Sequence, residues 1–534
     1  MHLRFPRTAS LVLTGIVVFF HIYYAFHAGG LWRDESNTVA LAGMPSVPDL
    51  WAHLEYDSFP VLWLLIVRFL QSFGLTADFG LRLLGCFVGL SIIATLWVNA
   101  RLMKFSAPLV SLVLLGFSPT IIRWGDSMRA YGFGICLILL TFALVWKLTT
   151  SPSPTTAILT TVVAICSVHT LYYNAVLLFA IGIAGTAVAW RHRRWDRALL
   201  VMAIGGIAAV SLIPYIHAVQ GAKKWNIVFS RSDFSLSLFW AKLSEALSSA
   251  GSGIRWVWVI IVTTATVVSV ISQFRPTSPQ EGGRRDVGLY CLVAFLVSIP
   301  AYFIFLKALG YPTQPWYYVA LMSVVAIAVD GVFAAAPGLW CRGYVRMVLA
   351  SAIAIWSFVP AWSAMHVRQT NIDVVAAKLG KLANTGDVIV VAPWYLGVSF
   401  ARYYEGAAPW TTLPPITDHK IHRYDLLKTQ MAATNPIDSV LAAMAKALRS
   451  GHQVWIVGGI SFPQPGQSPP LLAPAPYDPV GWSEGAYAET WSMQAGDLLQ
   501  THALNAEIVP LPGDQPISTY ENPMLIMAQG WKAP

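Results

Sequence analysis

Two adjacent carboxylates stand directly beyond the first apolar run of the chain, in Gly30-Leu-Trp-Arg-Asp-Glu-Ser36. Acidic side chains in or beside a bilayer are costly, so Asp34 and Glu35 are the first candidates for chemistry. A carboxylate in such a place suits proton abstraction from an attacking group. The structural alternative for Asp34 is a pair with Arg33 or a helix cap, and for Glu35 a place in the first helical turn.

A second polar segment, Asp126-Ser-Met-Arg-Ala-Tyr-Gly132, lies between two apolar runs. Asp126 is the second acidic candidate. The planar guanidinium of Arg129, together with Tyr131, suits binding of a phosphate group. The alternative is a structural pair between Asp126 and Arg129, which stand one helical turn apart.

Weaker candidates are Asp57, which precedes Pro60, and His169, which stands at the end of an apolar run. Each has a structural alternative: a solvated acid for Asp57 and a helix-end histidine for His169. Oxygen and imidazole ligands suit divalent ions, so Asp126, Asp57 and His169 are the residues to test for a metal. No spacing in the sequence establishes one, and the cofactor is left open.

Three lysines complete the set of candidate groups. Lys223 and Lys224 lie in the segment 220–252, and Lys307 precedes the aromatic stretch 311–318. Cations beside aromatic rings suit binding of a phosphate and stacking on a sugar. Snorkelling lysines with an interfacial aromatic belt explain the same residues equally well.

The composition indicates a protein that crosses a membrane many times. Of 534 residues, 56% are hydrophobic and 11% are charged, against roughly 25% charged in an ordinary soluble domain. The net charge of +9 does not indicate a nucleic-acid partner, because the basic residues gather in short loops between apolar runs, as the positive-inside rule requires. The five cysteines form no CxxC pattern and are expected to be small core residues.

A length of roughly 20 apolar residues per span predicts about 11 transmembrane helices, in a range of about 11 to 13. The predicted spans are 10–27, 80–100, 107–123, 131–149, 155–171, 174–189, 198–217, 254–272, 287–306, 316–335 and 345–364. The run 59–73 is short and contains Arg68, so it is predicted to be interfacial or re-entrant. The N-terminus is then cytoplasmic, and the candidate residues gather on the outer face.

Short spaced motifs resemble those of the GT-C glycosyltransferases. They are the Asp34-Glu35 pair, Tyr56-Asp-Ser-Phe-Pro-Val-Leu-Trp-Leu-Leu65, Ala77-Asp-Phe-Gly-Leu-Arg82, Asp126-Ser-Met-Arg-Ala-Tyr-Gly132 and His169-Thr-Leu-Tyr-Tyr173. The resembled branch contains the protein O-mannosyltransferases, the aminoarabinose transferases of lipid A and their bacterial relatives, including those of the Rgt type. Where that family often has His or Lys before two prolines, this chain has Ser58-Phe59-Pro60, which leaves the donor and acceptor types open.

The resemblance implies transfer of a sugar, with inversion, from a polyprenyl-phosphate carrier to a glycan, lipid or protein acceptor on the outer face. Asp34 is then the predicted base, Glu35 orients Asp34 or a bound cation, and cationic groups stabilise the departing phosphate. The branch implies the inner (plasma) membrane of a cell, with contacts to membrane lipid and none to nucleic acid.

The composition changes near residue 365. Residues 1–365 are predicted to form the transmembrane domain and residues 366–534 a periplasmic or extracellular α/β domain that recognises the acceptor or simply stabilises the protein. Its predicted elements are strands at 387–393, 454–459 and 524–528 and helices at 396–404 and 437–449. Gly458-Gly459 lacks a nucleotide-binding pattern.

Two other classes of function remain open. A transporter or flippase of a lipid-linked sugar is built from the same ingredients, although transporters hold substrates near the bilayer midplane. The acids of this chain are expected at helix ends instead, which favours the enzyme. A scaffold protein with an external domain leaves Asp34 and Asp126 unexplained.

Overall fold

The computed structural model describes residues 4–229, 234–274, 282–310, 313–336, 342–464, 466–478 and 481–532. The chain forms two compact units, which are described separately. We call them the helical unit (Met1–Phe26, Phe59–Ile216 and Asp233–Met365) and the sheet unit (His27–Ser58, His217–Ser232 and His366–Pro534). The domain boundary expected near residue 365 stays a prediction.

The helical unit is that of a multi-pass membrane protein. Nine helices of the described part of the chain are long and apolar enough to cross a membrane. They are α1 (Arg4–His27), α5 (Asp78–Leu102), α8 (Tyr131–Thr150), α10 (Tyr173–Arg191), α11 (Trp195–Val210) continued by α12 (Ile216–Phe229), α14 (Ile254–Phe274), α15 (Gly282–Leu309), α16 (Val319–Ala335) with the preceding 3-10 turn η5 (Pro315–Tyr318), and α17 (Arg342–Met365). Two shorter apolar helices are α4 (Val61–Ser72) and α9 (Pro154–Val168).

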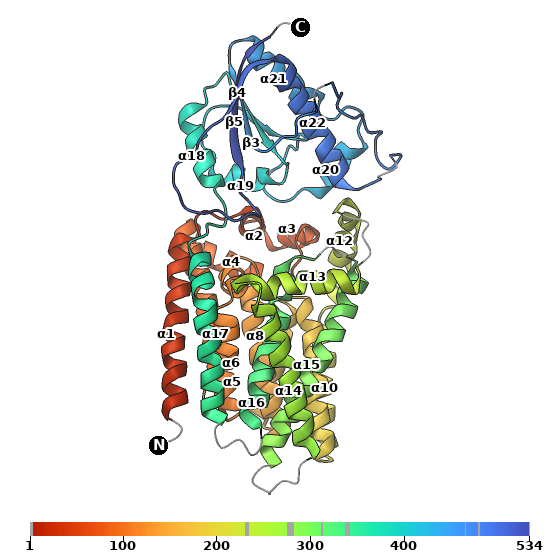
Figure 1. Ribbon diagram of the computed structural model, residues 1–534. Coiled ribbons are helices and arrows are strands. Elements are labelled where there is room, and N and C mark those ends of the chain that lie inside the picture. The colour runs from red at the N-terminus through yellow and green to blue at the C-terminus, as the bar shows by residue number, and fades with distance from the viewer. Residues whose placement is uncertain are drawn as a thin grey trace. The chain divides into compact units, whose positions relative to one another are not determined.

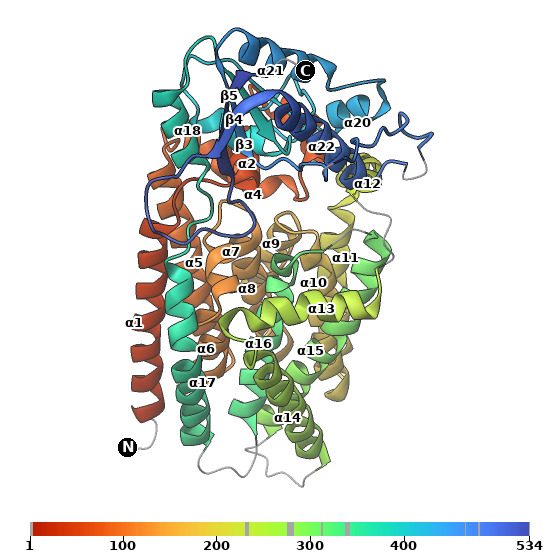
Figure 2. The ribbon, with the colours of Figure 1, turned by 45° about the horizontal axis from the view of Figure 1, so that its top comes forward.

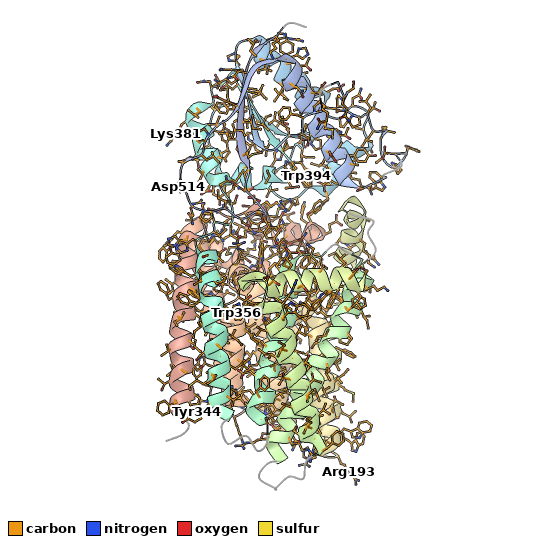
Figure 3. The ribbon with its side chains drawn as sticks, viewed as in Figure 1. Arg193, Tyr344, Trp356, Lys381, Trp394 and Asp514 are labelled. Atoms are coloured by element: carbon orange, nitrogen blue, oxygen red, sulfur yellow. The ribbon has the colours of Figure 1, made fainter. Side chains whose placement is uncertain are left out.

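Large apolar side chains cover the outside of several of these helices. Phe87, Phe179, Ile304 and Trp356 are all more than half exposed, and Figure 3 labels Trp356 on α17. An exposed apolar surface of this extent is costly in water and favourable in lipid. The polytopic helical fold expected from composition is therefore confirmed, while the interfacial or re-entrant placement of α4 stays a prediction.

One expected span is broken. The segment 107–123 forms two seven-residue helices, α6 (Val110–Gly116) and α7 (Pro119–Gly125). Ser118 accepts a hydrogen bond from the backbone N–H of Ile121, and Pro119 occupies the first turn of α7. A cap followed by proline starts a new helix and cannot continue an old one.

A buried ion pair holds the start of α6. Arg346 of α17 binds Asp330 of α16 at 2.6 Å, and Asp330 also accepts hydrogen bonds from the N–H groups of Leu109 and Ser111. The Asp330 side chain is completely buried. It therefore stabilises the N-terminus of α6 as well as pairing with Arg346.

The segment 220–252, expected to be an outer loop, is partly helical. It includes most of α12, then α13 (Leu236–Leu247) and a short turn η3 (Ser248–Ala250). Figure 1 shows α13 running across the long helices of the helical unit instead of parallel to them. Residues 230–233 of this segment lie outside the described residues.

One end of the helical unit carries Arg193 and the start of α17, which begins at Arg342. Figure 3 places Arg193, between α10 and α11, and Tyr344, near the start of α17, at the same end. The N-terminal end of α1 lies there too (Figure 1). This is the arrangement that the charge distribution predicts.

A five-stranded sheet forms the centre of the sheet unit. Its strands are β1 (Val388–Ala392), β2 (Trp410–Thr412), β3 (Gln453–Gly458), β4 (Ala503–Ile508) and β5 (Met524–Trp531), in the order β2-β1-β3-β5-β4. β1 pairs in parallel with β2 and β3, and β5 runs antiparallel to β3 and β4. The expected strands β1, β3 and β5 are the three central ones, whose continuous apolar runs are typical of strands buried on both faces.

Helices cover both faces of the sheet. Alternate residues of β1, β3 and β5 face α18 (Ile372–Leu382) and α19 (Leu396–Tyr403) on one side. The intervening residues face α20 (Tyr424–Ala432), α21 (Asp438–Arg449) and α22 (Glu484–His502) on the other. Figures 1 and 2 show α18 and α22 on opposite sides of the sheet. The predicted α/β architecture is therefore confirmed.

Three short elements from the N-terminal part of the chain belong to the sheet unit. They are α2 (Arg33–Ala42), α3 (Val47–Ala52) and the 3-10 turn η1 (Leu54–Tyr56). α2 packs against α19. The segment that carries Asp34 and Glu35 is thus part of the same compact unit as the C-terminal sheet.

Candidate functional site

Asp34 and Glu35 lie in the first turn of α2, where carboxylates interact favourably with the helix dipole. Glu35 is completely buried, and its Oε2 accepts a hydrogen bond of 3.3 Å from the backbone N–H of Trp32, as in a capping box. Asp34 remains 25% exposed. Of the two acids, Asp34 is therefore the one that a substrate can reach.

The segment before α2 is held by backbone hydrogen bonds to the C-terminal part of the sheet unit. Ala28 accepts a hydrogen bond from the N–H of Gln369, and the N–H of Leu31 donates to the Tyr403 hydroxyl. Gly29 has a φ of +72°, and a Cβ there would clash with the Arg368 guanidinium. A side chain at position 29 would therefore be strained by both backbone and contacts.

Arg33 packs among acidic and aromatic groups. Its guanidinium lies 4.2 Å from the centre of the Tyr395 ring and 3.5 Å from Asp34, and its backbone N–H donates to Glu521 at 2.9 Å. Burial lowers the pKa of Arg33, but Asp34, Tyr395 and Glu521 more than offset this, so the pKa is raised overall. The expected structural pair between Arg33 and Asp34 is present, at a distance that leaves it weak.

Glu521 is a buried acid that the sequence did not single out. Burial raises its pKa to about 7, although Arg33 and the hydrogen bond from the Arg33 N–H oppose the rise. The pKa of Glu484 is raised by burial too, against the opposing effects of Trp394 and Arg33. Trp394, labelled in Figure 3, donates from Nε1 to Glu484 at 2.6 Å.

His422 lies beside Asp34, with its Nε2 at 3.5 Å from Oδ1 of the carboxylate. This distance is that of an ion pair, longer than a good hydrogen bond. The backbone N–H of His422 donates to Asn37 of α2 at 2.9 Å. Because 385 residues separate Asn37 from His422, no sequence periodicity could have indicated this contact.

Asp57, Lys223 and Lys224 are the other candidates of the sheet unit. Asp57 accepts a hydrogen bond of 2.7 Å from the N–H of the next residue, Ser58, as a turn acid does. Lys223 and Lys224 are exposed on α12. On the same helix, a Cβ at Gly221 would meet the Glu55 side chain.

Asp126 follows α7 in the helical unit and pairs with a residue that the sequence analysis missed. Its Oδ1 and Oδ2 lie 2.7 and 2.9 Å from Nδ1 of His21 on α1. The two side chains are 3% and 1% exposed. An ionisable residue inside an apolar span indicates a paired or functional position. His21 is such a residue, so the sequence contained this indication. The structural alternative for Asp126 was a pair with Arg129, whereas the structure pairs Asp126 with His21.

Glycines of α5 make room for this pair. A Cβ at Gly89 would clash with the Asp126 carboxylate and the His21 ring, and a Cβ at Gly85 would clash with the Asp126 carbonyl. Gly85 and Gly89 form a GxxxG pattern, which lets a neighbouring backbone approach closely. This pattern was the available sequence signal for a close contact.

Arg129 and Tyr131 belong to an aromatic cluster of the helical unit. The Arg129 guanidinium lies 4.3 Å from the centre of the Phe59 ring, and the Phe59 and Tyr131 rings meet edge to face at 4.9 Å. Trp63 donates to the Met128 carbonyl at 2.9 Å and fixes the segment from the α4 side. The structure thus brings together Phe59 and the two residues predicted to bind phosphate.

The stretch 311–318 reaches the same cluster. Tyr317 of η5 lies 6.3 Å from Tyr131 between ring centres, and Trp316 lies 4.3 Å from Trp124. Trp316, Tyr317 and Tyr318 are buried, whereas Lys307 near the end of α15 is exposed. Residues 311 and 312 lie outside the described part of the chain.

The residues predicted to hold a metal do not form a ligand set. Nδ1 of His169 lies 2.9 Å from the Tyr215 hydroxyl and Nε2 lies 3.0 Å from the Ser211 hydroxyl, so both ring nitrogens are occupied. Asp126 pairs with His21 instead. The residues that the structure describes contain no group of three or more His, Cys, Asp and Glu side chains placed to hold a metal.

A groove of about 400 Å³ in the sheet unit lies between α21, α22 and the segment 469–472. Trp491, Gln494 and Asp497 are among its lining residues. None of the predicted site residues lines it, so it is separate from the Asp34 cluster.

The structure is similar to that of ArnT from Cupriavidus metallidurans bound to undecaprenyl phosphate, with a TM-score of 0.50 and 11% identity over 84% of this chain and 93% of that chain. It is also similar to the oligosaccharyltransferase of Archaeoglobus fulgidus tethered with an acceptor peptide, with a TM-score of 0.47 and 10% identity over 84% of this chain and 69% of that chain. The sequence matches no protein-family model and no curated protein. The likeness to ArnT supports the fold that the sequence predicts, a polytopic helical membrane part with a C-terminal α/β part.

Proposed function

We propose that the protein is an integral-membrane inverting glycosyltransferase that moves a sugar from a polyprenyl-phosphate carrier to an acceptor outside the membrane. The observation that carries the proposal is Asp34, a partly exposed carboxylate at the start of α2 with Arg33 and His422 beside it. The fold shared with ArnT, a protein solved with undecaprenyl phosphate, supports the choice of donor.

In the proposed reaction Asp34 takes the proton of the acceptor hydroxyl as its oxygen attacks the anomeric carbon. The new carbon–oxygen bond forms as the bond from that carbon to the phosphate oxygen breaks. The carrier phosphate leaves with the electron pair of the broken bond, and the configuration at the anomeric carbon inverts. The proton ends on Asp34 and then passes to solvent, for which the exposed quarter of its side chain leaves a path.

Cationic groups are proposed to stabilise the leaving phosphate. Arg129 in the aromatic cluster is the first candidate, because its guanidinium presents a planar set of donors. Lys307, Lys223 and Lys224 are exposed and are the candidates for screening the charge of the carrier. The proposed acceptor is a glycan, a lipid or a protein.

The second candidate function is transport of a lipid-linked sugar without transfer. The buried pairs Asp126–His21 and Asp330–Arg346 favour it, since ionisable groups inside a helical membrane unit often mark transport pathways. Asp330 and Arg346 are also fully engaged by backbone groups of the 107–111 segment, which favours a structural role.

The test uses the full chain in nanodiscs with radiolabelled undecaprenyl-phosphate sugars and a panel of glycan, lipid A and peptide acceptors. The proposal expects a labelled acceptor and free undecaprenyl phosphate in equal amounts. In parallel, proteoliposomes loaded with the labelled lipid report its movement across the bilayer. Movement of intact donor with no labelled acceptor would establish the transporter instead.

A further inference from the structure

We infer that His422 is the positioning residue for the Asp34 carboxylate, so that the C-terminal part of the chain supplies half of an Asp–His pair at the site of transfer. The inference rests on the proposed function, because it gives His422 a role in that reaction. It concerns contacts within the sheet unit alone.

Helix α2 meets His422 at two points one helical turn apart. Asp34 faces the His422 ring at 3.5 Å, and Asn37 accepts a hydrogen bond from the His422 backbone N–H at 2.9 Å. Residues three apart on a helix lie on the same face, so both contacts come from one side of α2. The backbone contact fixes where the ring stands, and the ring then stands next to the carboxylate.

Aromatic neighbours restrain the ring itself. Tyr424 stacks on His422 with an angle of 18° between planes and 5.8 Å between centres, and Trp394 meets the ring edge-on at 6.0 Å. Trp394 is held in turn by Glu484. His422 is 5% exposed. A buried ring restrained on two sides has few orientations available, which is the property that a positioning residue needs.

Among the residues that the structure describes, neither ring nitrogen of His422 has a hydrogen-bond partner. A buried polar atom without a partner costs free energy. The Asp34 carboxylate is 3.5 Å from Nε2, and catalytic hydrogen bonds are often long before substrate binds and shorten afterwards. A small movement of either side chain would form the bond and remove that cost.

Other charged or titratable groups stand near this pair in the chain or contact its neighbours, and they belong to any account of its pH dependence. Arg33 and Glu35 lie on α2 with Asp34, and the 418–425 segment of His422 also carries Asp418, His419, Lys420, Arg423, Tyr424 and Asp425. Tyr395 and Glu521 contact Arg33, and Glu484 contacts Trp394.

An N–H group of His422 aimed at Asp34 would do two things. It would hold the carboxylate in one orientation toward the acceptor hydroxyl, and it would stabilise the ionised form that abstracts the proton. Misplacing a catalytic group by about 1 Å costs on the order of 10²-fold in rate, so loss of the ring is expected to lower kcat without changing donor binding.

The experiment compares wild type with His422→Ala and His422→Gln, and uses His452→Ala as the control because His452 is an exposed histidine of the same unit. His422→Ala is expected to lower kcat by roughly 10- to 100-fold, with the donor KM within about twofold of wild type. Its acidic limb in the profile of kcat/KM against pH should move to higher pH. His422→Gln, whose amide N–H replaces the Nε2–H donor, should recover most of the rate.

Two results would overturn the inference: an unchanged kcat and pH limb in His422→Ala, or equal losses in His422→Ala and His422→Gln. A measurement that does not depend on sugar transfer tests the Asp34–His422 contact separately from the proposed function. In histidine-labelled protein, the nitrogen chemical shifts of His422 should change in Asp34→Asn and stay as in wild type in Asp57→Asn. If neither wild type nor any variant transfers sugar, the proposed function is wrong. If the His422 nitrogen shifts are unchanged in Asp34→Asn, the contact between Asp34 and His422 is absent and the inference is wrong.

Discussion

Oδ1 of Asp126 lies 2.7 Å from Nδ1 of His21, although 105 residues separate them in the sequence. The pair joins α1 to the turn that begins the Arg129 segment, and it is almost completely buried. A buried pair of this kind stabilises the protein only while its geometry is kept, because either partner left buried without the other costs free energy of folding. Gly89 of α5 is what leaves the space for it.

Gly89→Ala is expected to displace the pair. The added Cβ meets both the Asp126 carboxylate and the His21 ring, and overpacking a filled interior costs about 1–3 kcal/mol. Thermal unfolding in detergent should show a lower Tm, and transfer should fall. Gly205→Ala is the control, since nothing lies within 4 Å of a Cβ there. Equal stability of the two variants would contradict the close approach.

Removing Arg346 should destabilise the helical unit far more than removing an exposed cation. Arg346→Leu leaves Asp330 buried without its counter-ion, and breaking a buried pair costs about 3–5 kcal/mol. Lys242→Ala, which breaks the exposed pair with Glu245, should cost at most about 1 kcal/mol. Chemical unfolding measures both. A loss for Arg346→Leu no larger than the loss for Lys242→Ala would refute the role of the buried pair.

Arg129→Gln is expected to raise the donor KM by about tenfold or more, because a hydrogen bond to a charged group contributes roughly 1.5–3 kcal/mol. Phe59→Leu removes the ring beneath the guanidinium and should weaken donor binding less, in line with about 0.5–2 kcal/mol for a cation–π contact. Binding of undecaprenyl phosphate to the purified variants gives the same comparison without turnover. Arg101→Gln, at the exposed end of α5, should bind as wild type; a loss as large as that of Arg129→Gln would remove the special role of Arg129.

Glu521 should make stability fall as the pH rises. Its pKa is raised from 4.5 to about 7 in the folded protein, so between these values the folded state holds a proton that the unfolded state has lost. The slope of unfolding free energy against pH is then negative in this window and flat above it. At 1.36 kcal/mol per pKa unit the fall is at most about 3 kcal/mol.

Glu521→Gln removes this titration and should flatten the Tm of the full chain between about pH 4.5 and pH 7. Glu507→Gln, at an exposed position of β4, should keep the wild-type slope. The account of Glu521 fails if the two variants show the same dependence on pH.

The sequence contained enough to predict the fold class and the central strands. Apolar length predicted nine of the spans, and the runs at β1, β3 and β5 are continuous enough to mark buried strands. It did not predict the break before α7. The prediction followed the length of the apolar run, which continues past Ser118 and Pro119, although a capping serine followed by proline indicates the start of a new helix. It also missed α18, α20 and α22, whose apolar residues are interrupted by polar ones.

The partners of the candidate residues were harder to predict. Asp34 and Asp126 could be found because acids beside apolar runs are rare, but His422 and His21 are 388 and 105 positions away along the chain. Only folding brings them together, and no local pattern encodes such pairs. The proposed roles of Asp34, Glu35, Asp126, Asp57 and the lysines remain predictions.

The most direct test of the central claim is single-turnover transfer from a labelled undecaprenyl-phosphate sugar by wild type and Asp34→Asn, with donor binding measured on the same preparations. The account predicts that Asp34→Asn binds the donor with wild-type affinity and transfers at least about 10²-fold more slowly, the lower bound for loss of a general base. Transfer at the wild-type rate by a folded Asp34→Asn protein would contradict it.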